Sequence, residues 1–176
     1  MTLVAMKEVV TAPPPTDARA LRDALGRFVT GVTVVTSRTK TGKACGVTVN
    51  SFASLSLDPP LVLWSLSLTS SSHPAFDEAT HFVVHVLADG QEGIARQFAR
   101  SGIDRFAGLE LDVGPEGIPV LPGVAARFEC RTLYRYWGGD HVIFVGRVDA
   151  FDQAPDRDPL VFFSGGMRQL APGAAL

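Results

Sequence analysis

A row of short neutral polar side chains is the first feature of this sequence that could bind a ligand. The stretch Gly46–Pro60 alternates mainly apolar odd positions with even positions that carry hydroxyl or amide groups: Thr48, Asn50, Ser54 and Ser56. This alternation is typical of a β-strand with one face toward a core and one polar face. A strand facing water would usually carry Lys, Glu or Arg, yet no charge precedes Asp58. The row therefore suits a buried polar ligand, although an ordinary Ser/Thr-rich strand has the same pattern.

A second group of hydroxyl side chains lies in the run Thr69–Ser72. Ser72 is expected to cap a short helix that has Pro74 in its first turn, where the missing N–H does no harm. The free N–H groups of this helix start, beside the four hydroxyl residues, would make a seat for a phosphate. A loop that only caps the helix fits equally well. The run lacks the glycines and lysine of a nucleotide-hydrolysing P-loop, so nucleotide hydrolysis has no support.

His141 could act at the rim of a pocket. It follows the turn Gly138-Gly139-Asp140 and begins a β-branched, apolar segment. Imidazole at a strand start can donate a hydrogen bond or position a proton. The alternative interpretation is a surface histidine in a turn, with no functional role.

Other kinds of chemistry have little support. His81 and His85 would share one face of a strand, but no Cys, Asp or Glu follows at ligand spacing, so no metal site is expected. The sequence has no Gly-x-Ser-x-Gly motif, and Cys45 and Cys130 have no evident histidine partner, which leaves hydrolase triads unsupported.

Length and composition favour one globular domain. The chain has 176 residues, 46% of them hydrophobic and 19% charged, and a formal net charge of −2, which offers no basic field for nucleic acid. The two cysteines are expected to be free thiols, and no apolar run approaches the length of a membrane span. We expect a cytoplasmic protein with a tail at residues 1–15, one domain at 16–170 and a C-terminal tail at 171–176.

The elements that would position these side chains are mostly strands. A helix capped by Thr16 or Asp17 is expected to cover one end of the sheet with Leu21, Leu25 and Phe28. A second helix is expected at Gln91–Ala99, and a long covering loop at Ser101–Pro122. Strands are expected at Val32–Ser37, Gly46–Pro60, Leu61–Ser67, Phe82–Leu87, Ala126–Tyr136, His141–Phe151 and Pro159–Phe163. Their hairpin-like spacing favours an antiparallel barrel with short helices over βαβ units.

Two segments resemble a known family. Gly46–Val62, together with Phe28–Thr36, closely resembles the flavin reductases that supply reduced flavin to two-component monooxygenases. Further matches occur in the same order along the chain: Ser72-His73, Phe98-Ala99, Asp104-Arg105-Phe106, Gly139-Asp140-His141 and Pro159–Phe163 before Gly165-Gly166. The resemblance covers roughly residues 21–170.

The resemblance implies a mainly β, Greek-key split barrel that is homodimeric, binds FMN or FAD and reduces the flavin with NADH or NADPH. It implies that the isoalloxazine is lined by Thr48, Val49, Asn50 and Ser51, and that the ribityl chain contacts Ser54, Ser65, Leu66 and Ser67. Ser71 and Ser72 would receive the phosphate, Phe98 would flank the flavin or adenine, Arg168 could contact a phosphate, and His141 would seat the nicotinamide. A separate monooxygenase would be the partner. A non-catalytic flavin carrier or sensor of the same fold, or a barrel used only for dimeric interaction, are the alternatives.

Overall fold

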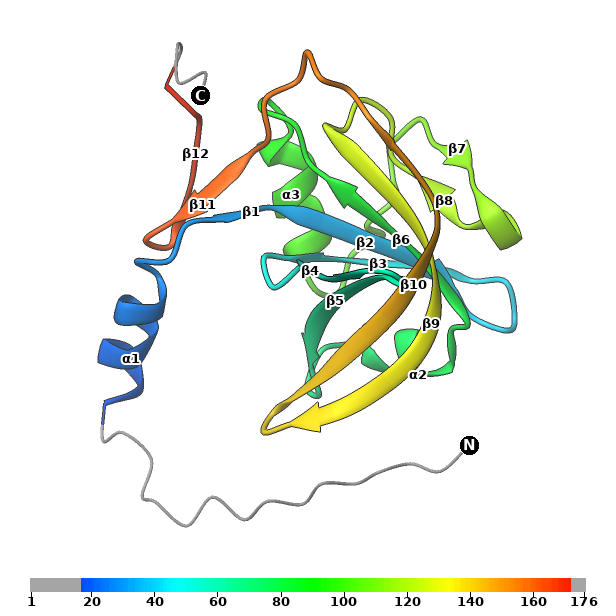
Figure 1. The fold of residues 1–176 in the computed structure, drawn as a ribbon, viewed down its shortest axis with the longest axis horizontal. Helices are drawn as coiled ribbons and strands as arrows, with labels where there is room; N and C mark the ends of the chain where they lie inside the picture. Colours follow the sequence, from blue (N-terminus) through cyan, green and yellow to red (C-terminus); the bar gives the residue numbers. More distant parts are fainter. Residues whose placement is uncertain (1–16, 172–176) are drawn as a thin grey trace.

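The computed structural model describes residues 17–171 and is dominated by one curved antiparallel sheet (Figure 1). Its seven strands have the order β3-β2-β6-β9-β10-β5-β4. Their bounds are β2 Thr33–Arg38, β3 Ala44–Val49, β4 Ala53–Leu57, β5 Pro60–Ser67, β6 His81–Val86, β9 Ala126–Gly138 and β10 His141–Gln153. The predicted residues 1–15 and most of the 171–176 segment lie outside the described part. The mainly β class with short helices is confirmed.

The remaining elements surround this sheet. A three-stranded sheet joins β1 (Thr30–Gly31), β11 (Val161–Phe163) and β12 (Gly166–Arg168). The helices are α1 (Ala18–Leu25), α2 (His73–Glu78) and α3 (Glu92–Ala99). None of the helices among residues 17–171 has the length and hydropathy of a membrane span. The expected loop at Ser101–Pro122 contains only short elements: β7 (Asp112–Val113), a 3-10 turn at Pro115–Gly117 and β8 (Pro119–Val120).

The expectation of one strand across Gly46–Pro60 was wrong. The segment breaks at Asn50–Phe52, and the two halves, β3 and β4, lie at opposite edges of the sheet. Because so short a connection joins both edges, the sheet must curl until they approach each other. Leu55 and Leu57, which alternation would place against the core, are 49% and 93% exposed, because β4 carries a register shift and extends beyond the body at the sheet edge.

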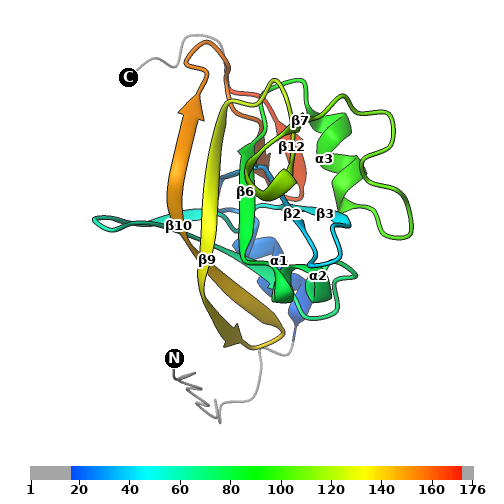
Figure 2. The ribbon, with the colours of Figure 1, turned by 90° about the vertical axis from the view of Figure 1, so that its right-hand side faces the viewer.

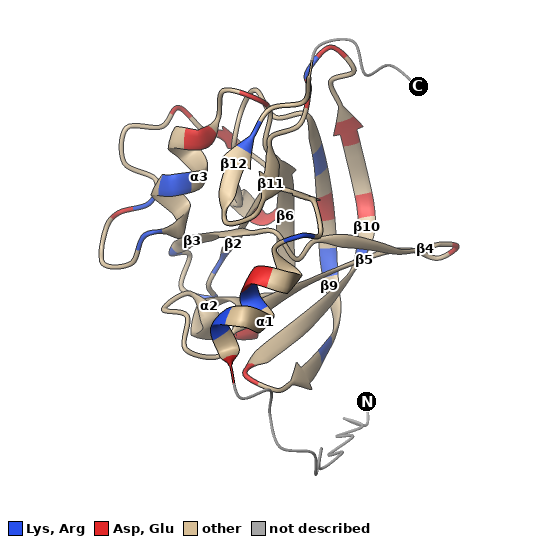
Figure 3. Ribbon diagram, turned by 90° about the vertical axis from the view of Figure 1, so that its left-hand side faces the viewer, with Lys and Arg blue, Asp and Glu red and all other residues tan. Residues whose placement is uncertain are grey.

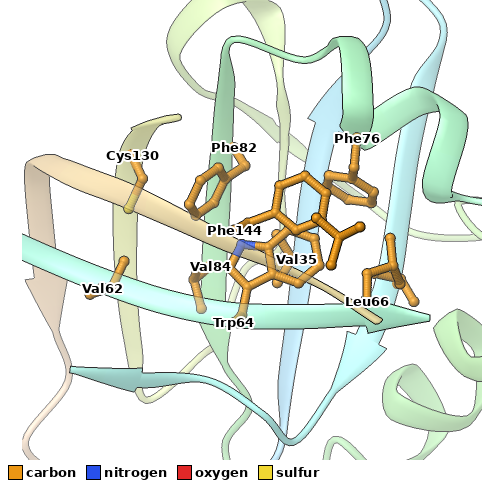
Figure 4. Close-up of a cluster of buried hydrophobic side chains, with 11 residues drawn as sticks. Val35, Val62, Trp64, Leu66, Phe76, Phe82, Val84, Cys130 and Phe144 are labelled. Carbon is orange, nitrogen blue, oxygen red and sulfur yellow. The ribbon is translucent and has the colours of Figure 1, made fainter. Parts of the chain in front are cut away.

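The main core lies inside the curved sheet (Figure 4). Alternation along β5 predicts Trp64 and Leu66 on one face, and both are buried there. The Trp64 indole stacks on Phe144 with centroids 4.6 Å apart, while Phe76 and Phe82 meet it edge-on. Each such ring stabilises the fold by roughly 1.5–3 kcal/mol through burial. This packing fixes β5 and β10 against α2.

A second core cluster attaches α3 to the back of β2 and β3. Ala95 and Phe98 are fully buried against Val34 and Leu87. Figure 2 shows β10, β9 and β6 side by side, with α3 beyond them on the other flank of the molecule. This attachment places the start of the 101–122 segment beside β3.

Helix α1 does not cover the end of the sheet as expected. Asp17 caps it, accepting hydrogen bonds from the N–H groups of Arg19 and Ala20. The helix contains no buried residue, Leu25 is 67% exposed, and Phe28, beyond the helix end, is 77% exposed. In Figure 1 it lies to one side of the sheet. Its apolar side chains Leu21 and Leu25 are exposed within the described residues.

Candidate functional site

A cavity of about 290 Å³ lies where the end of β3 approaches the end of β5. Strand β3 and the Asn50–Phe52 connection form one wall, and the end of β5 forms another. His141 and Ser70 complete it. The lining residues are Val47, Thr48, Val49, Asn50, Ser51, Ser65, Leu66, Ser67, Ser70 and His141. None of them is Asp, Glu, Lys or Arg, and β3, β4 and β5 carry no charged residue (Figure 3).

Ser51 joins the two walls. Its hydroxyl donates to the Ser65 carbonyl at 3.0 Å and accepts from the Ser65 N–H at 3.0 Å. The Thr48 hydroxyl is also engaged, donating to the Ala95 carbonyl of α3 at 2.7 Å. Asn50, by contrast, is exposed, and its carboxamide makes no hydrogen bond to another described residue. The Asn50 carboxamide is therefore a donor and acceptor still available to a ligand.

His141 stands where the β9–β10 turn meets the end of β5. Its backbone pairs with Ser67, and the Leu68 N–H donates to the Asp140 carbonyl at 2.9 Å, so the turn is tied to the cavity wall. The imidazole Nδ1 donates to the Asp140 carboxylate at 2.7 Å. This hydrogen bond lowers the pKa of Asp140. Because Nδ1 is engaged, Nε2 is the nitrogen left to face a ligand.

A larger cavity of about 860 Å³ follows the first along β3. Ala44, Cys45 and Gly46 line it, directly before the residues that line the smaller cavity. Other walls come from the β2–β3 turn, the α2 region and the 101–106 segment: Thr39, Lys43, Ser71, Ser72, Pro74, Ala75, Glu78, Gly102, Ile103, Asp104, Arg105 and Phe106. Burial raises the pKa of the Cys45 thiol to about 11, so this thiol stays protonated at neutral pH.

The structure brings ten of the thirteen predicted site residues to these two cavities. The smaller one gathers Thr48, Val49, Asn50, Ser51, Ser65, Leu66, Ser67 and His141, and the larger one has Ser71 and Ser72. Ser72 precedes α2 as predicted, but its hydroxyl hydrogen-bonds the Gly46 carbonyl at 3.4 Å instead of capping the helix.

Three predicted residues line neither cavity. Ser54 is exposed on β4, and Arg168 is exposed on β12, where it donates to its neighbour's carbonyl at 2.8 Å. Phe98 is fully buried, so its ring packs beneath the larger cavity, edge-on to Phe106. A flavin or adenine ring could reach Phe98 only by displacing the core around it.

Several lining residues were not predicted from the sequence. Ser70 lines the smaller cavity, and its place in the hydroxyl run Thr69–Ser72 is the feature that could have indicated it. Lys43 and Arg105 lie far apart in sequence and only the fold brings them together. No cluster of three or more His, Cys, Asp or Glu suited to a metal ion occurs among residues 17–171.

Comparison with known proteins identifies this architecture. The family model of the flavin reductase like domain matches residues 25–171. The chain belongs to the flavin reductase family. It is 52% identical over 159 residues to the FMN reductase (NADH) SmoA of Agrobacterium fabrum, covering 90% of this chain and 89% of that relative.

Two further relatives extend the comparison. The reductase component of the flavin-dependent trigonelline monooxygenase of Acinetobacter baylyi is 46% identical over 136 residues, which span 77% of this chain but only 44% of that protein. Among solved structures, the NADH:FAD oxidoreductase of Streptomyces globisporus in complex with NAD and FAD fragments superposes with a TM-score of 0.86 at 39% identity, over 93% of this chain and 99% of that one.

Proposed function

We propose that this protein is an NAD(P)H-dependent flavin reductase, which transfers hydride from nicotinamide to FMN or FAD and supplies reduced flavin to a separate monooxygenase. The observation that carries the proposal is the uncharged polar cavity at the joined sheet edges of a flavin reductase family member. The names of the relatives include an FMN reductase, an NADH:FAD oxidoreductase and a monooxygenase reductase component, which supports each part of the proposal.

The smaller cavity suits the neutral edge of an isoalloxazine. Such a ring presents carbonyl and ring-nitrogen groups that need hydrogen bonds but no counter-charge. Asn50 offers an unengaged carboxamide, while Thr48 and Ser51 hold the backbone of this wall in place through their own hydrogen bonds. The end of β5, Ser65–Ser67, forms the opposite wall. We therefore assign the ring to this cavity and the phosphate-bearing tail to the larger one, beside Ser71 and Ser72.

His141 is placed to seat the nicotinamide at the rim. Its Nδ1 is fixed by Asp140, so the ring orientation is set before any ligand enters. When bound, the nicotinamide and the flavin supply the redox chemistry themselves, by hydride transfer. His141 contributes a hydrogen bond from Nε2 that orients the nicotinamide, and the β3 and β5 walls hold the flavin still and exclude water from its ring.

The assembly is part of the same proposal. The curved sheet with joined edges corresponds to a split barrel, and the uncovered apolar side chains of Leu25 and Phe28 favour a homodimer in which a second copy covers them. A cytoplasmic location is consistent with the free thiols Cys45 and Cys130 and with a need for reduced nicotinamide.

Anaerobic flavin bleaching tests this function directly. Purified protein is mixed with FMN or FAD and with NADH or NADPH, and the oxidised flavin absorbance is followed without oxygen. We expect fast, protein-dependent bleaching with at least one pair. Flavin binding without bleaching for every pair would instead identify a flavin carrier or sensor.

A further inference from the structure

His85 joins β6 to two other parts of the chain. Its side chain is fully buried, and its Nε2 accepts a hydrogen bond from the Leu121 N–H at 3.2 Å. Because Nε2 is the acceptor, Nδ1 carries the proton, and it donates to the Val34 carbonyl of β2 at 3.0 Å. Leu121 follows β8, near the end of the 101–122 segment. One ring nitrogen is therefore held by the sheet and the other by that segment.

Two further contacts hold this end of the segment against the sheet. The Thr36 hydroxyl of β2 donates to the Pro119 carbonyl at 2.7 Å in a buried hydrogen bond. The residues on either side of Pro119 pack against Val83 of β6 in a small buried cluster. Of these three contacts, only the hydrogen bond to the histidine depends on the protonation of a side chain.

The start of the same segment forms a wall of the larger cavity, which residues 102–106 line. Phe106 packs edge-on to Phe98 of α3, with ring centroids 5.1 Å apart. Leu121 belongs to the same buried cluster as Phe98, and Phe106 packs against that cluster. Since one cluster holds both ends of the segment, a displacement of Leu121 removes packing from the residues that shape the cavity.

We propose that His85 is a positioning residue for the flavin site: it holds the far end of the 101–122 segment and thereby keeps residues 102–106 in the shape that receives the flavin tail. This role rests on the proposed function and belongs to a residue that lines neither cavity. Since closure of the segment favours flavin binding, flavin binding must favour closure by the same factor. A bound flavin should therefore protect the Leu121 N–H, an effect that a purely structural histidine would not produce.

The ionisable groups that flank His85 come from β6, β9 and β10, since residues 118–121 and 33–37 are all uncharged. They are Arg127 and Glu129 of β9, Asp152 of β10 and His81 at the start of β6. Burial is the main reason that the His85 pKa falls from 6.5 to about 4; the hydrogen bond to β2 and the charge of Asp152 oppose the fall, and Arg127 adds to it. The buried imidazole is therefore neutral at pH 7.

The closed segment is expected to be sensitive to acid. Opening of the segment would expose the imidazole and return its pKa to the ordinary 6.5. The open form then takes up a proton at a higher pH than the closed form, so the closed form has its full stability above pH 6.5 and loses it as the pH falls toward 4. Between pH 7 and pH 5 the open fraction should rise by about twentyfold.

Hydrogen exchange of the Leu121 amide, followed by NMR in the full chain with and without FMN, tests the proposal. We expect this amide to be less protected than the amides of the β5–β10 pair, because the segment opens without unfolding of the sheet. Its protection factor should fall about twentyfold from pH 7 to pH 5. Saturating FMN should raise it by about fivefold or more, although Leu121 lines neither cavity.

Two substitutions on β6 assign the effect to one side chain. His85→Gln removes the titrating group, and His81→Gln, at the start of the same strand, is the matched control. In His85→Gln the Leu121 amide should be less protected at pH 7 and lose its dependence on pH between 7 and 5. FMN binding, measured by flavin fluorescence, should weaken by about fivefold or more. His81→Gln should behave as the wild type.

The wild-type measurements decide the matter even if His85→Gln does not fold. Equal protection of Leu121 and the β5–β10 amides would show that the segment opens only when the whole fold unfolds. Unchanged protection of Leu121 in saturating FMN would show that the segment is not coupled to the site. Either result overturns the role of His85 and leaves the proposed function intact, whereas failure of the wild type to bind FMN or FAD would refute the proposed function itself.

Discussion

The hydrogen bond between His141 and Asp140 determines what this histidine can do. It joins two exposed side chains, so its contribution to stability is small, and its value lies in orienting the imidazole. With Nδ1 engaged, only Nε2 can meet a ligand in the cavity. His141 is therefore expected to influence nicotinamide turnover far more than folding or flavin binding.

Replacement of His141 by Ala should lower NADH-dependent flavin reduction by about tenfold or more, because the nicotinamide loses an orienting hydrogen bond. Flavin affinity should stay within several-fold of wild type. Stopped-flow reduction under anaerobic conditions and a flavin titration measure the two effects. His81→Ala is the control, since His81 lies at the start of β6 and lines neither cavity. Unchanged NADH oxidation in His141→Ala would remove this residue from the mechanism.

Gly46, on β3, lies directly against the Phe98 ring of α3. A Cβ at this position would lie 2.6 Å from the Phe98 ring, a distance that real side chains do not tolerate. Gly46→Ala should therefore destabilise the fold by about 1–3 kcal/mol, through overpacking. Urea denaturation measures the loss. Gly31→Ala is the matched control, because nothing lies within 4 Å of a Cβ there.

The same close approach links Gly46 to the cavity. Phe98 packs edge-on to Phe106, and the carbonyls on either side of Phe106, those of Arg105 and Ala107, accept hydrogen bonds from the Gln97 side chain. The double variant Gly46→Ala with Phe98→Leu should recover part of the lost stability, since the smaller side chain vacates the contested space. A double variant no more stable than Gly46→Ala would contradict this explanation.

Site residues that are close together in sequence could be predicted, and those from distant segments could not. Thr48–Ser51 follow a polar alternation and Ser65–Ser67 were implied by the family resemblance, and all of them line one cavity. Arg105 belongs to a segment that matches the family, but its place beside Lys43 was not predicted, because only tertiary packing brings the two residues to one cavity. Phe98, which the resemblance implies beside the flavin or adenine, is fully buried, and a resemblance does not reveal that a side chain is buried.

At the scale of elements, most strands and the hairpin turns were predicted from local alternation and turn residues. The exception is Gly46–Pro60, where alternation continues across a break in the strand. Alternation indicates which face of a strand a residue lies on, but it does not indicate which strand pairs with it. Whether Gly46–Pro60 forms one long strand or two edge strands depends on the pairing of β3 with β2 and of β4 with β5.

His85 fastens three elements together at the back of the sheet. It lies on β6 and is fully buried; its Nδ1 donates to the Val34 carbonyl of β2 at 3.0 Å, and its Nε2 accepts from the Leu121 N–H, after β8, at 3.2 Å. Only a neutral imidazole can make both hydrogen bonds. Burial is the main reason that its pKa falls from the ordinary 6.5 to about 4.

This histidine predicts acid sensitivity in a defined pH range. The unfolded chain takes up a proton near pH 6.5 but the folded chain only near 4, so stability is complete above 6.5 and falls as the pH drops between these values. From about pH 7 to about pH 5 the loss should be on the order of 2 kcal/mol. Urea denaturation across this range measures it. His85→Gln should be less stable at pH 7 and lose this pH dependence; a wild-type-like slope in the variant would assign the effect elsewhere.

At the scale of the whole molecule, α1 buries none of its side chains against residues 17–171. The following residues attach it to the small sheet, where the Ser164 N–H donates to the Gly26 carbonyl at 2.9 Å and Arg27 lies over the Phe163 ring. Its amphipathic pattern was predicted, but the prediction that it covers the end of the sheet was wrong, because a pattern of apolar residues does not specify the surface against which they pack.

Substitution of Leu25 and Phe28 by Lys tests the proposed homodimer. Each side chain should contribute on the order of 2 kcal/mol when a second copy covers it, so the dimer dissociation constant should rise by at least about tenfold. Sedimentation velocity over a range of concentrations measures this change. Val113→Lys, which alters a residue that is 79% exposed on β7, serves as the control. A dimer unaffected by the double substitution would place the interface elsewhere.

The short connection Asn50–Phe52 joins the two edges of the sheet. All residues that line the smaller cavity except His141 therefore come from one continuous segment, residues 47–70. Most of the cavity wall can therefore be exchanged between proteins as a single segment. Transplanting this segment between family members should carry ring preference with it, while the phosphate-facing residues, which come from separate parts of the chain, would remain those of the recipient.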